Sequence, residues 1–103
     1  MYIAMTRVRL KPGTATDCAA LFETTNPKLV AAEADWLGAK MVFDPDTEII
    51  TVLATWKDKD AYKRLNQSAP FQDTMKQFAA FFAGPPEISM NEVLVEMSPD
   101  VSP

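Results

Sequence analysis

Residues 36–57 read WLGAKMVFDPDTEIITVLATWK, and this stretch contains the strongest structural signal in the sequence. Side chains alternate in character on both sides of Asp44-Pro45-Asp46-Thr47, which is the pattern of two strands. Asp at the first turn position and Pro at the second favour a type I turn. The stretch therefore predicts an antiparallel hairpin with strands over 36–43 and 48–57.

The residues before the hairpin predict a strand and a helix. Residues 2–11 alternate with period two, and Pro12-Gly13 ends that strand. Thr14, with Asp17 three residues on, predicts a capped helix that starts at Ala15. Asn26-Pro27 has the composition of a helix start, which predicts a break and a short continuation to about residue 33.

The residues after the hairpin predict a second helical region and a last strand. Asp58 is suited to cap the next helix, and Ser68-Ala69-Pro70 interrupts that helix and restarts a longer one. Gly84-Pro85-Pro86 is a strong helix stop, and an apolar strand over 87–97 follows it. The order β-α-β-β-α-β predicts one α+β, ferredoxin-like domain over 1–97 with an antiparallel sheet. Residues 98–103 are expected to form a disordered tail.

The two faces of the predicted sheet differ in composition. The face expected to pack under the helices is apolar: Leu37, Ala39, Met41, Phe43, Ile50, Val52, Ala54 and Trp56. The opposite face mixes polar residues with large apolar ones: Ile3, Met5, Trp36, Val42, Ile49 and Leu53. Helices in this topology cover one face only, so the second face predicts a homodimer joined through its sheets.

Composition narrows the functional classes. The chain has 103 residues, a net charge of -4, one cysteine and no histidine. Nucleic acid and membranes are not expected partners, because there is no clustered basic charge and no long apolar run. A lone Cys18 and the early Arg7 and Arg9 predict a cytoplasmic protein without disulfides. Without histidine, catalytic triads and His-ligated metals are excluded.

Three stretches carry a resemblance to a known family: KPGTATD at 11–17, LVAAE at 29–33 leading to LG at 37–38, and ATWKDKDAY at 54–62. With the element order, they resemble the antibiotic biosynthesis monooxygenase domain family over residues 2–97. The resemblance implies a dimeric α+β barrel with a pocket between sheet and helices in each subunit. It also implies activities that include cofactor-independent oxidation of quinone-like aromatics, haem degradation and small-molecule isomerisation.

The haem-degrading branch of that family uses an Asn, a Trp and a His. The matching places hold Thr6, Leu65 and Met75, so haem degradation is not expected. Another branch keeps a His where this chain has Arg64-Leu65-Asn66. No metal, flavin, nicotinamide or other cofactor is expected, since there is no Gly-rich phosphate loop and no Cys or His cluster. The catalytic residues stay unknown at this point.

Alternation places Tyr2 and Thr6 on the helix-facing side of the first strand, where a pocket would open. The expected lining is Tyr2, Thr6, Met41, Trp56, Tyr62, Leu65, Asn66, Met75 and Asn91. Each also has a structural explanation: Thr6 as a β-former, Trp56 as core, and the methionines as adaptable packing. Trp36 is expected in dimer packing, with ligand stacking as the alternative. Arg7 and Arg9 are expected to pair across the barrel with Glu92 or Glu96.

Two functions fit these residues. The first is a cofactor-independent monooxygenase that acts on a small aromatic or quinol-type molecule. The alternative is a non-catalytic dimer of the same fold that binds a small ligand or serves as an interaction module. An RNA-binding module of this strand order is excluded, because the strand at 48–53 lacks the aromatics that stack on bases.

Overall fold

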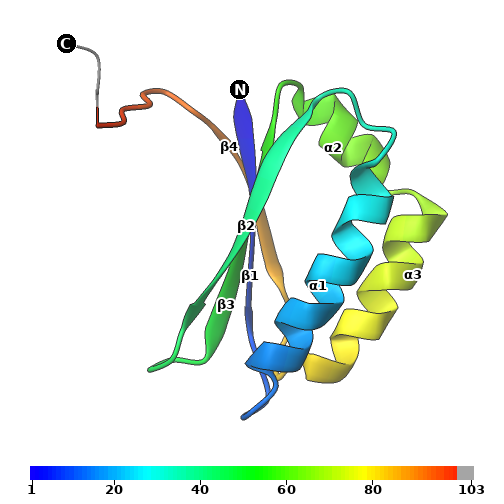
Figure 1. Cartoon of the computed structure of the whole chain (residues 1–103), viewed down its shortest axis with the longest axis vertical. Coiled ribbons are helices and arrows are strands. Elements are labelled where there is room, and N and C mark those ends of the chain that lie inside the picture. Colours follow the sequence, from blue (N-terminus) through cyan, green and yellow to red (C-terminus); the bar gives the residue numbers. More distant parts are fainter. Residues whose placement is uncertain (100–103) are drawn as a thin grey trace.

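The computed structural model describes residues 1–99. Its elements follow in the order β-α-β-β-α-α-β, so the predicted ferredoxin-like α+β fold is confirmed. The strands are β1 (Tyr2–Arg9), β2 (Trp36–Asp44), β3 (Ile49–Trp56) and β4 (Glu87–Glu92). The helices are α1 (Ala15–Val30), α2 (Lys59–Asn66), α3 (Ala69–Phe78) and the 3-10 turn η1 (Ala79–Phe81). The strands form one antiparallel sheet in the order β2-β3-β1-β4, and the helices cover one of its faces (Figure 1).

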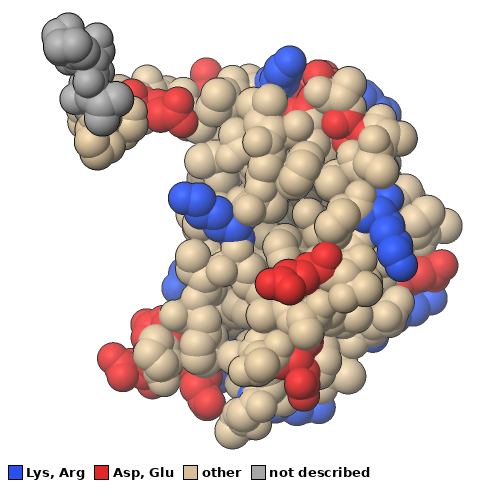
Figure 2. Space-filling model, viewed as in Figure 1, with Lys and Arg blue, Asp and Glu red and all other residues tan. Residues whose placement is uncertain are grey.

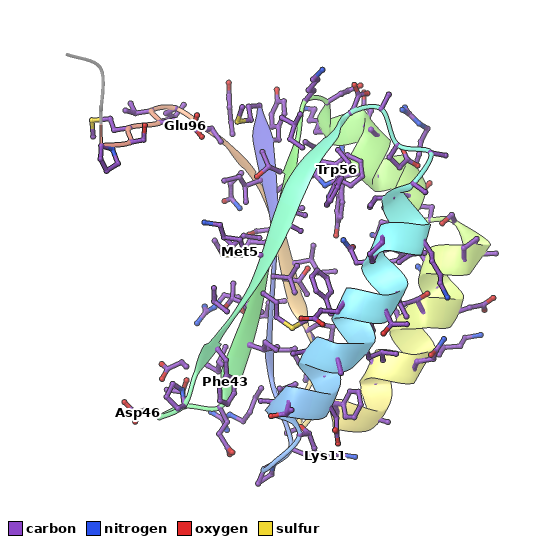
Figure 3. All side chains as sticks on the ribbon, in the orientation of Figure 1. Met5, Lys11, Phe43, Asp46, Trp56 and Glu96 are labelled. Carbon is purple, nitrogen blue, oxygen red and sulfur yellow. The ribbon has the colours of Figure 1, made fainter. Side chains whose placement is uncertain are left out.

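Strand β1 lies inside the sheet and sets its two faces. Thr6 pairs with Val52 of β3 and with Ile88 of β4, so these three residues share the helix-facing side. Ala4, on the same side, is only 2% exposed. Met5 lies on the other side and points away from the helices (Figure 3). The period-two pattern of β1 thus predicted both faces correctly.

The start of β2 contains a bulge that strict alternation did not predict. Trp36 pairs with Trp56, yet Gly38 pairs with Thr55, so the register shifts by one residue between them. A one-residue shift reverses the direction of the side chains beyond it. Trp36 therefore packs against the core, and Leu37 is 43% exposed. The predictions of a buried Leu37 and of Trp36 on the open face are wrong.

The turn between β2 and β3 covers residues 45–48 and so lies one residue later than predicted. The Asp44 carboxylate accepts a hydrogen bond from the Asp46 N–H at 2.9 Å, and this bond lowers the pKa of Asp44. The Glu48 N–H donates to the Asp44 carbonyl at 2.8 Å. Glu48 has a φ of 58° and belongs to the turn, so β3 begins at Ile49. The predicted hairpin is confirmed.

Helix α1 starts at Ala15, as predicted, but two details differ. The Thr14 hydroxyl donates to the Lys11 carbonyl at 2.7 Å and makes no cap hydrogen bond, so the predicted capping box is wrong. The helix also runs unbroken through Pro27 to Val30. Proline removes one N–H close to the end of the helix, and buried Val30 beyond it anchors the last turn in the core.

The predicted cap at Asp58 and the predicted restart of the helix at Ser68-Ala69-Pro70 are confirmed, and Ser68 also caps the second helix. The Asp58 carboxylate accepts from the Asp60 N–H at 3.0 Å at the start of α2. The Ser68 hydroxyl accepts from the Phe71 N–H at 3.3 Å at the start of α3. Short polar side chains at these positions satisfy amide groups that the first helical turn leaves free. The sequence could therefore place both helix starts.

Strand β4 ends at Glu92, so the predicted strand over 87–97 is too long. Its neighbour in the sheet is β1, and Glu92 already pairs with Tyr2, the first residue of β1. The Val93 N–H still donates to the Met1 carbonyl at 3.0 Å, and after it the segment leaves the sheet (Figure 1). Three apolar side chains of this segment are strongly exposed: Leu94 at 85%, Val95 at 73% and Met97 at 88%. Of the predicted tail over 98–103, residues 100–103 lie outside the described residues.

The core between sheet and helices consists of two clusters. One gathers around Trp56 and Tyr62, and the other around Leu10 and Phe78. Trp56 lies between the sheet and the helices in Figure 3 and is 1% exposed. Within residues 1–99, no helix has both the length and the apolar character needed to cross a bilayer.

Candidate functional site

A cavity of about 100 Å³ lies between the two core clusters, with the sheet on one side and the helices on the other. Strands β1 and β3 contribute small and β-branched side chains to its wall, among them Ala4, Thr6 and Val52. Helix α1 contributes Phe22 and Leu29, and α3 contributes Phe71, Met75 and Phe78. In Figure 2, uncharged atoms form most of the seam between the sheet and the helices.

Tyr62 brings the main hydroxyl to this cavity. It lies on the buried side of α2 with Ala61 and Leu65, and it is 8% exposed. Burial raises the pKa of Tyr62, and the nearby Thr6 side chain opposes this shift in part. The phenol therefore stays protonated at neutral pH and can donate a hydrogen bond inside the cavity.

Trp56 stands beside Tyr62 at the end of β3. Their ring centroids are 5.8 Å apart and the rings meet at 63°, an edge-to-face contact. The indole Nε1 of Trp56 is buried and has no hydrogen-bond partner within residues 1–99. Trp56 thus holds the core together and also presents an unpaired donor in a residue that lines the cavity.

Helix α1 supplies polar residues that the sequence did not point to. Thr25 and Asn26 line the cavity together with Phe22 and Leu29. These positions follow helical spacing, which could have identified them. The break predicted at Asn26-Pro27 concealed the pattern, since it assigned Asn26 to a helix cap. The Thr25 hydroxyl donates to the Leu21 carbonyl at 2.8 Å, which leaves the Asn26 amide as the more available group.

The cavity wall holds no carboxylate, no lysine and no arginine among the described residues. Its titratable side chains are Tyr62 and Cys18. Burial raises the pKa of the Cys18 thiol, and the residue is 1% exposed, so it is protonated at neutral pH. Across residues 1–99, no three His, Cys, Asp or Glu side chains group in a way that could hold a metal ion.

The structure brings six of the nine expected site residues to the cavity: Thr6, Met41, Trp56, Tyr62, Leu65 and Met75. Asn91 does not line it. It pairs with Ile3 and therefore lies on the open face of the sheet, where its amide donates to the Ile3 carbonyl at 3.2 Å. Tyr2 faces the helices but pairs with Glu92 at the far end of β1, beyond the cavity. Asn66 ends α2, and its carbonyl accepts from Gln72 at 2.6 Å, outside the lining.

The fold and the cavity together define a class: ferredoxin-like α+β proteins with an apolar pocket enclosed between sheet and helices. A family model of antibiotic biosynthesis monooxygenases matches residues 1–77, and the chain belongs to this family. No curated protein sequence matches the chain.

Solved structures show the same fold. A Bordetella bronchiseptica protein aligns with a TM-score of 0.80 at 21% identity, covering 91% of this chain and 97% of that one. Rv0793 from Mycobacterium tuberculosis aligns with a TM-score of 0.75 at 14% identity, covering 94% and 98%. A variant of SnoaB, a cofactor-independent oxygenase from Streptomyces nogalater, aligns with a TM-score of 0.76 at 15% identity, covering 96% and 97%. At these identities the likeness concerns the fold alone.

Proposed function

We propose that the protein is a cofactor-independent monooxygenase that oxidises a small aromatic or quinol-type molecule in the cytoplasm. The observation that carries this proposal is the apolar cavity on whose wall the side chains of Tyr62 and Thr6 both lie. The family to which the chain belongs supports oxygenation.

The substrate supplies the electrons in this reaction. A phenol that has lost its proton transfers electrons to O2, and the ring carbon then forms a new bond to oxygen. For a simple phenol the balance is one phenol and one O2 giving one quinone and one water. The Tyr62 hydroxyl, whose raised pKa keeps it protonated, donates to the oxygen that carries the negative charge. The apolar wall of the cavity strengthens this hydrogen bond.

The proton of the substrate has no strong acceptor on the cavity wall. Tyr62 and Cys18 are both protonated at neutral pH, and no carboxylate lines the cavity among the described residues. General base catalysis needs a group within hydrogen-bond reach whose pKa lies near the working pH. We therefore propose that the substrate ionises by its own acidity and loses its proton to water.

The missing base also favours a second candidate, a non-catalytic dimer that binds a small ligand in the same cavity. Oxygen uptake by purified, chelator-treated protein with a panel of hydroquinones and phenols separates the two candidates. Turnover without added flavin or iron supports the oxygenase. Tyr62→Phe should then lower the rate, whereas Tyr2→Phe, outside the cavity, should not. If no compound of the panel causes oxygen uptake, the result supports the non-catalytic binding protein.

We also propose that the protein acts as a homodimer joined through the face of the sheet that the helices leave open. This face carries Ile3, Met5, Val42, Ile49 and Leu53 by register. Val42 is 47% exposed, and the bulge adds Leu37 at 43%. Contiguous apolar patches of this kind mark interfaces. A second copy would also give the apolar segment after β4 a strand to pair with.

A further inference from the structure

Two arginines on the open face of the sheet have no acidic partner within residues 1–99. Arg7 and Arg9 are exposed and lie two residues apart on β1, so their side chains point to the same face. Glu87 of β4 pairs with Arg7 in the sheet, but the one ion pair in the described part of the chain joins Lys76 to Asp73. An acid that meets these arginines therefore has to come from outside this copy of the fold.

The two arginines border a hollow at one end of the open face. Its volume is about 320 Å³, and Ile49, Pro85 and Glu87 line it together with Arg7 and Arg9. Ile49 pairs with Arg9, so an apolar side chain lies beside a guanidinium that has no carboxylate across the strand. The hollow is therefore suited to a partner that presents a carboxylate and an apolar side chain close together.

The segment after β4 presents both kinds of side chain. Residues 92–103 contain three acidic side chains and no basic one. Glu92 pairs with Tyr2, which turns Glu92 toward the helices, whereas Glu96 lies on the part of the segment that has left the sheet (Figure 3). Leu94 is strongly exposed. In an extended chain Leu94 and Glu96 point to the same side, so they can enter one hollow together.

The segment and the hollow of one copy lie at opposite ends of the sheet. The segment leaves the sheet beside Tyr2, and the arginines lie toward the other end of β1, roughly 23 Å away at Arg9. A two-fold axis that runs across the strands would place the segment of each copy over the arginines of the other. An axis along the strands would instead bring the two acidic segments together, where like charges repel.

We propose that the hollow is the docking site for residues 94–97 of a second copy, with the Glu96 carboxylate paired to Arg7 and Arg9 and with Leu94 packed on Ile49. Pairs of carboxylate and guanidinium are directional, so this contact also fixes how the two sheets are oriented. The inference rests on the proposed homodimer and adds to it which ends of the two copies meet. In a two-fold dimer the contact occurs twice.

An exchange of charges tests this contact. Arg9→Glu and Glu96→Arg should each raise the dimer dissociation constant about tenfold, because the dimer doubles a loss of about threefold per contact. The chain with both substitutions should return to within about threefold of the native value. Lys28→Glu, at an exposed position of α1, is the matched control and should neither weaken the dimer nor compensate Glu96→Arg. Additive losses in the chain with both substitutions would overturn the contact.

A cross-link identifies the copy that provides the segment. Ile49→Cys and Leu94→Cys are prepared as separate chains, mixed and oxidised, while the native Cys18 is buried. A disulfide-linked dimer should form in the mixture and not with either variant alone. A disulfide found only within single chains that carry both substitutions would place the segment on its own copy and overturn the proposal. A native dimer that gives neither cross-link nor charge compensation would overturn the docking site alone, whereas a monomeric native chain would overturn the homodimer with it.

Discussion

Trp36 and Trp56 pair across β2 and β3, and the next pair of the ladder joins Gly38 to Thr55. The extra residue, Leu37, therefore forms a bulge at the end of the sheet that lies over the cavity. The bulge places both indoles on the helix side, where both line the cavity, and it moves Leu37 to the surface. A regular strand would have removed Trp36 from the site.

Gly38 should be required for this bulge. Its φ of +140° is disfavoured for residues with a Cβ. No heavy atom lies within 4 Å of the position that a Cβ would take at Gly38, so the cost of Gly38→Ala is backbone strain alone. We expect a loss of about 1–2 kcal/mol in the free energy of unfolding, measured with urea. Gly84→Ala is the matched control, because its backbone is unstrained and its surroundings are equally open. Equal losses in both variants would contradict this explanation.

Leu53→Asp should weaken the dimer. Leu53 pairs with Met5 and with Lys40 on the open face, and a carboxylate there would have to lose its water in the interface, a cost that the neighbouring Lys40 offsets only in part. The expected cost is about 3 kcal/mol, or roughly a hundredfold in the dimer dissociation constant. Sedimentation or light scattering over a concentration series measures it. Ala20→Asp adds the same charge to an exposed position of α1 and should leave the dimer intact. A native chain that stays at 11.4 kDa at micromolar concentration would refute the interface.

The segment after β4 should contribute to the same dimer. Leu94, Val95 and Met97 are exposed apolar residues in a stretch with strand-like composition. Ending the chain after Glu92 should therefore raise the dimer dissociation constant, since it removes apolar surface that a second copy would bury. Ending it after Met97 should have no effect. If the two truncated chains dimerise equally well, the segment has no part in the interface.

Ionisation of Tyr62 should lower the free energy of unfolding at alkaline pH. Burial raises the pKa of Tyr62 above its ordinary value of 10.0, so the unfolded chain loses this proton first as the pH rises. The stabilisation is complete below about pH 10 and is lost as the pH climbs through the raised pKa. Tyr62→Phe should flatten the fall in unfolding free energy above pH 10. The earlier loss from Cys18, whose pKa is raised from 9.0, should remain in this variant.

The pH dependence of turnover should be set by the pKa of the substrate. Because the cavity wall offers no group that accepts a proton at neutral pH, the rate should rise with the ionised fraction of the phenol. Two phenols of different acidity should then give rate profiles whose midpoints differ by the difference in their pKa values. A common midpoint for both phenols would instead indicate a base supplied by the protein.

Local sequence determined the features that depend on local chemistry. Alternation gave the faces of β1, and Asp58 and Ser68 gave the starts of α2 and α3, because a cap needs only the amides of the next turn. The composition of the hairpin turn was enough to pair β2 with β3. Six of the nine expected site residues lie on the cavity wall, because the spacing of residues along a helix or strand fixes which of its sides is buried.

Tertiary packing decided what no local pattern contains. Helix α1 continues past Pro27 because the core holds Val30, and this places Asn26 at the cavity. Strand β4 stops at Glu92, where its pairing with β1 ends at Tyr2, although the residues that follow are apolar. The bulge before Gly38 brings Trp36 beside Trp56 through a register shift that alternation cannot reveal. Each of these depends on a neighbour distant in the chain, and the free energy of burial and pairing with that neighbour outweighs the local preference.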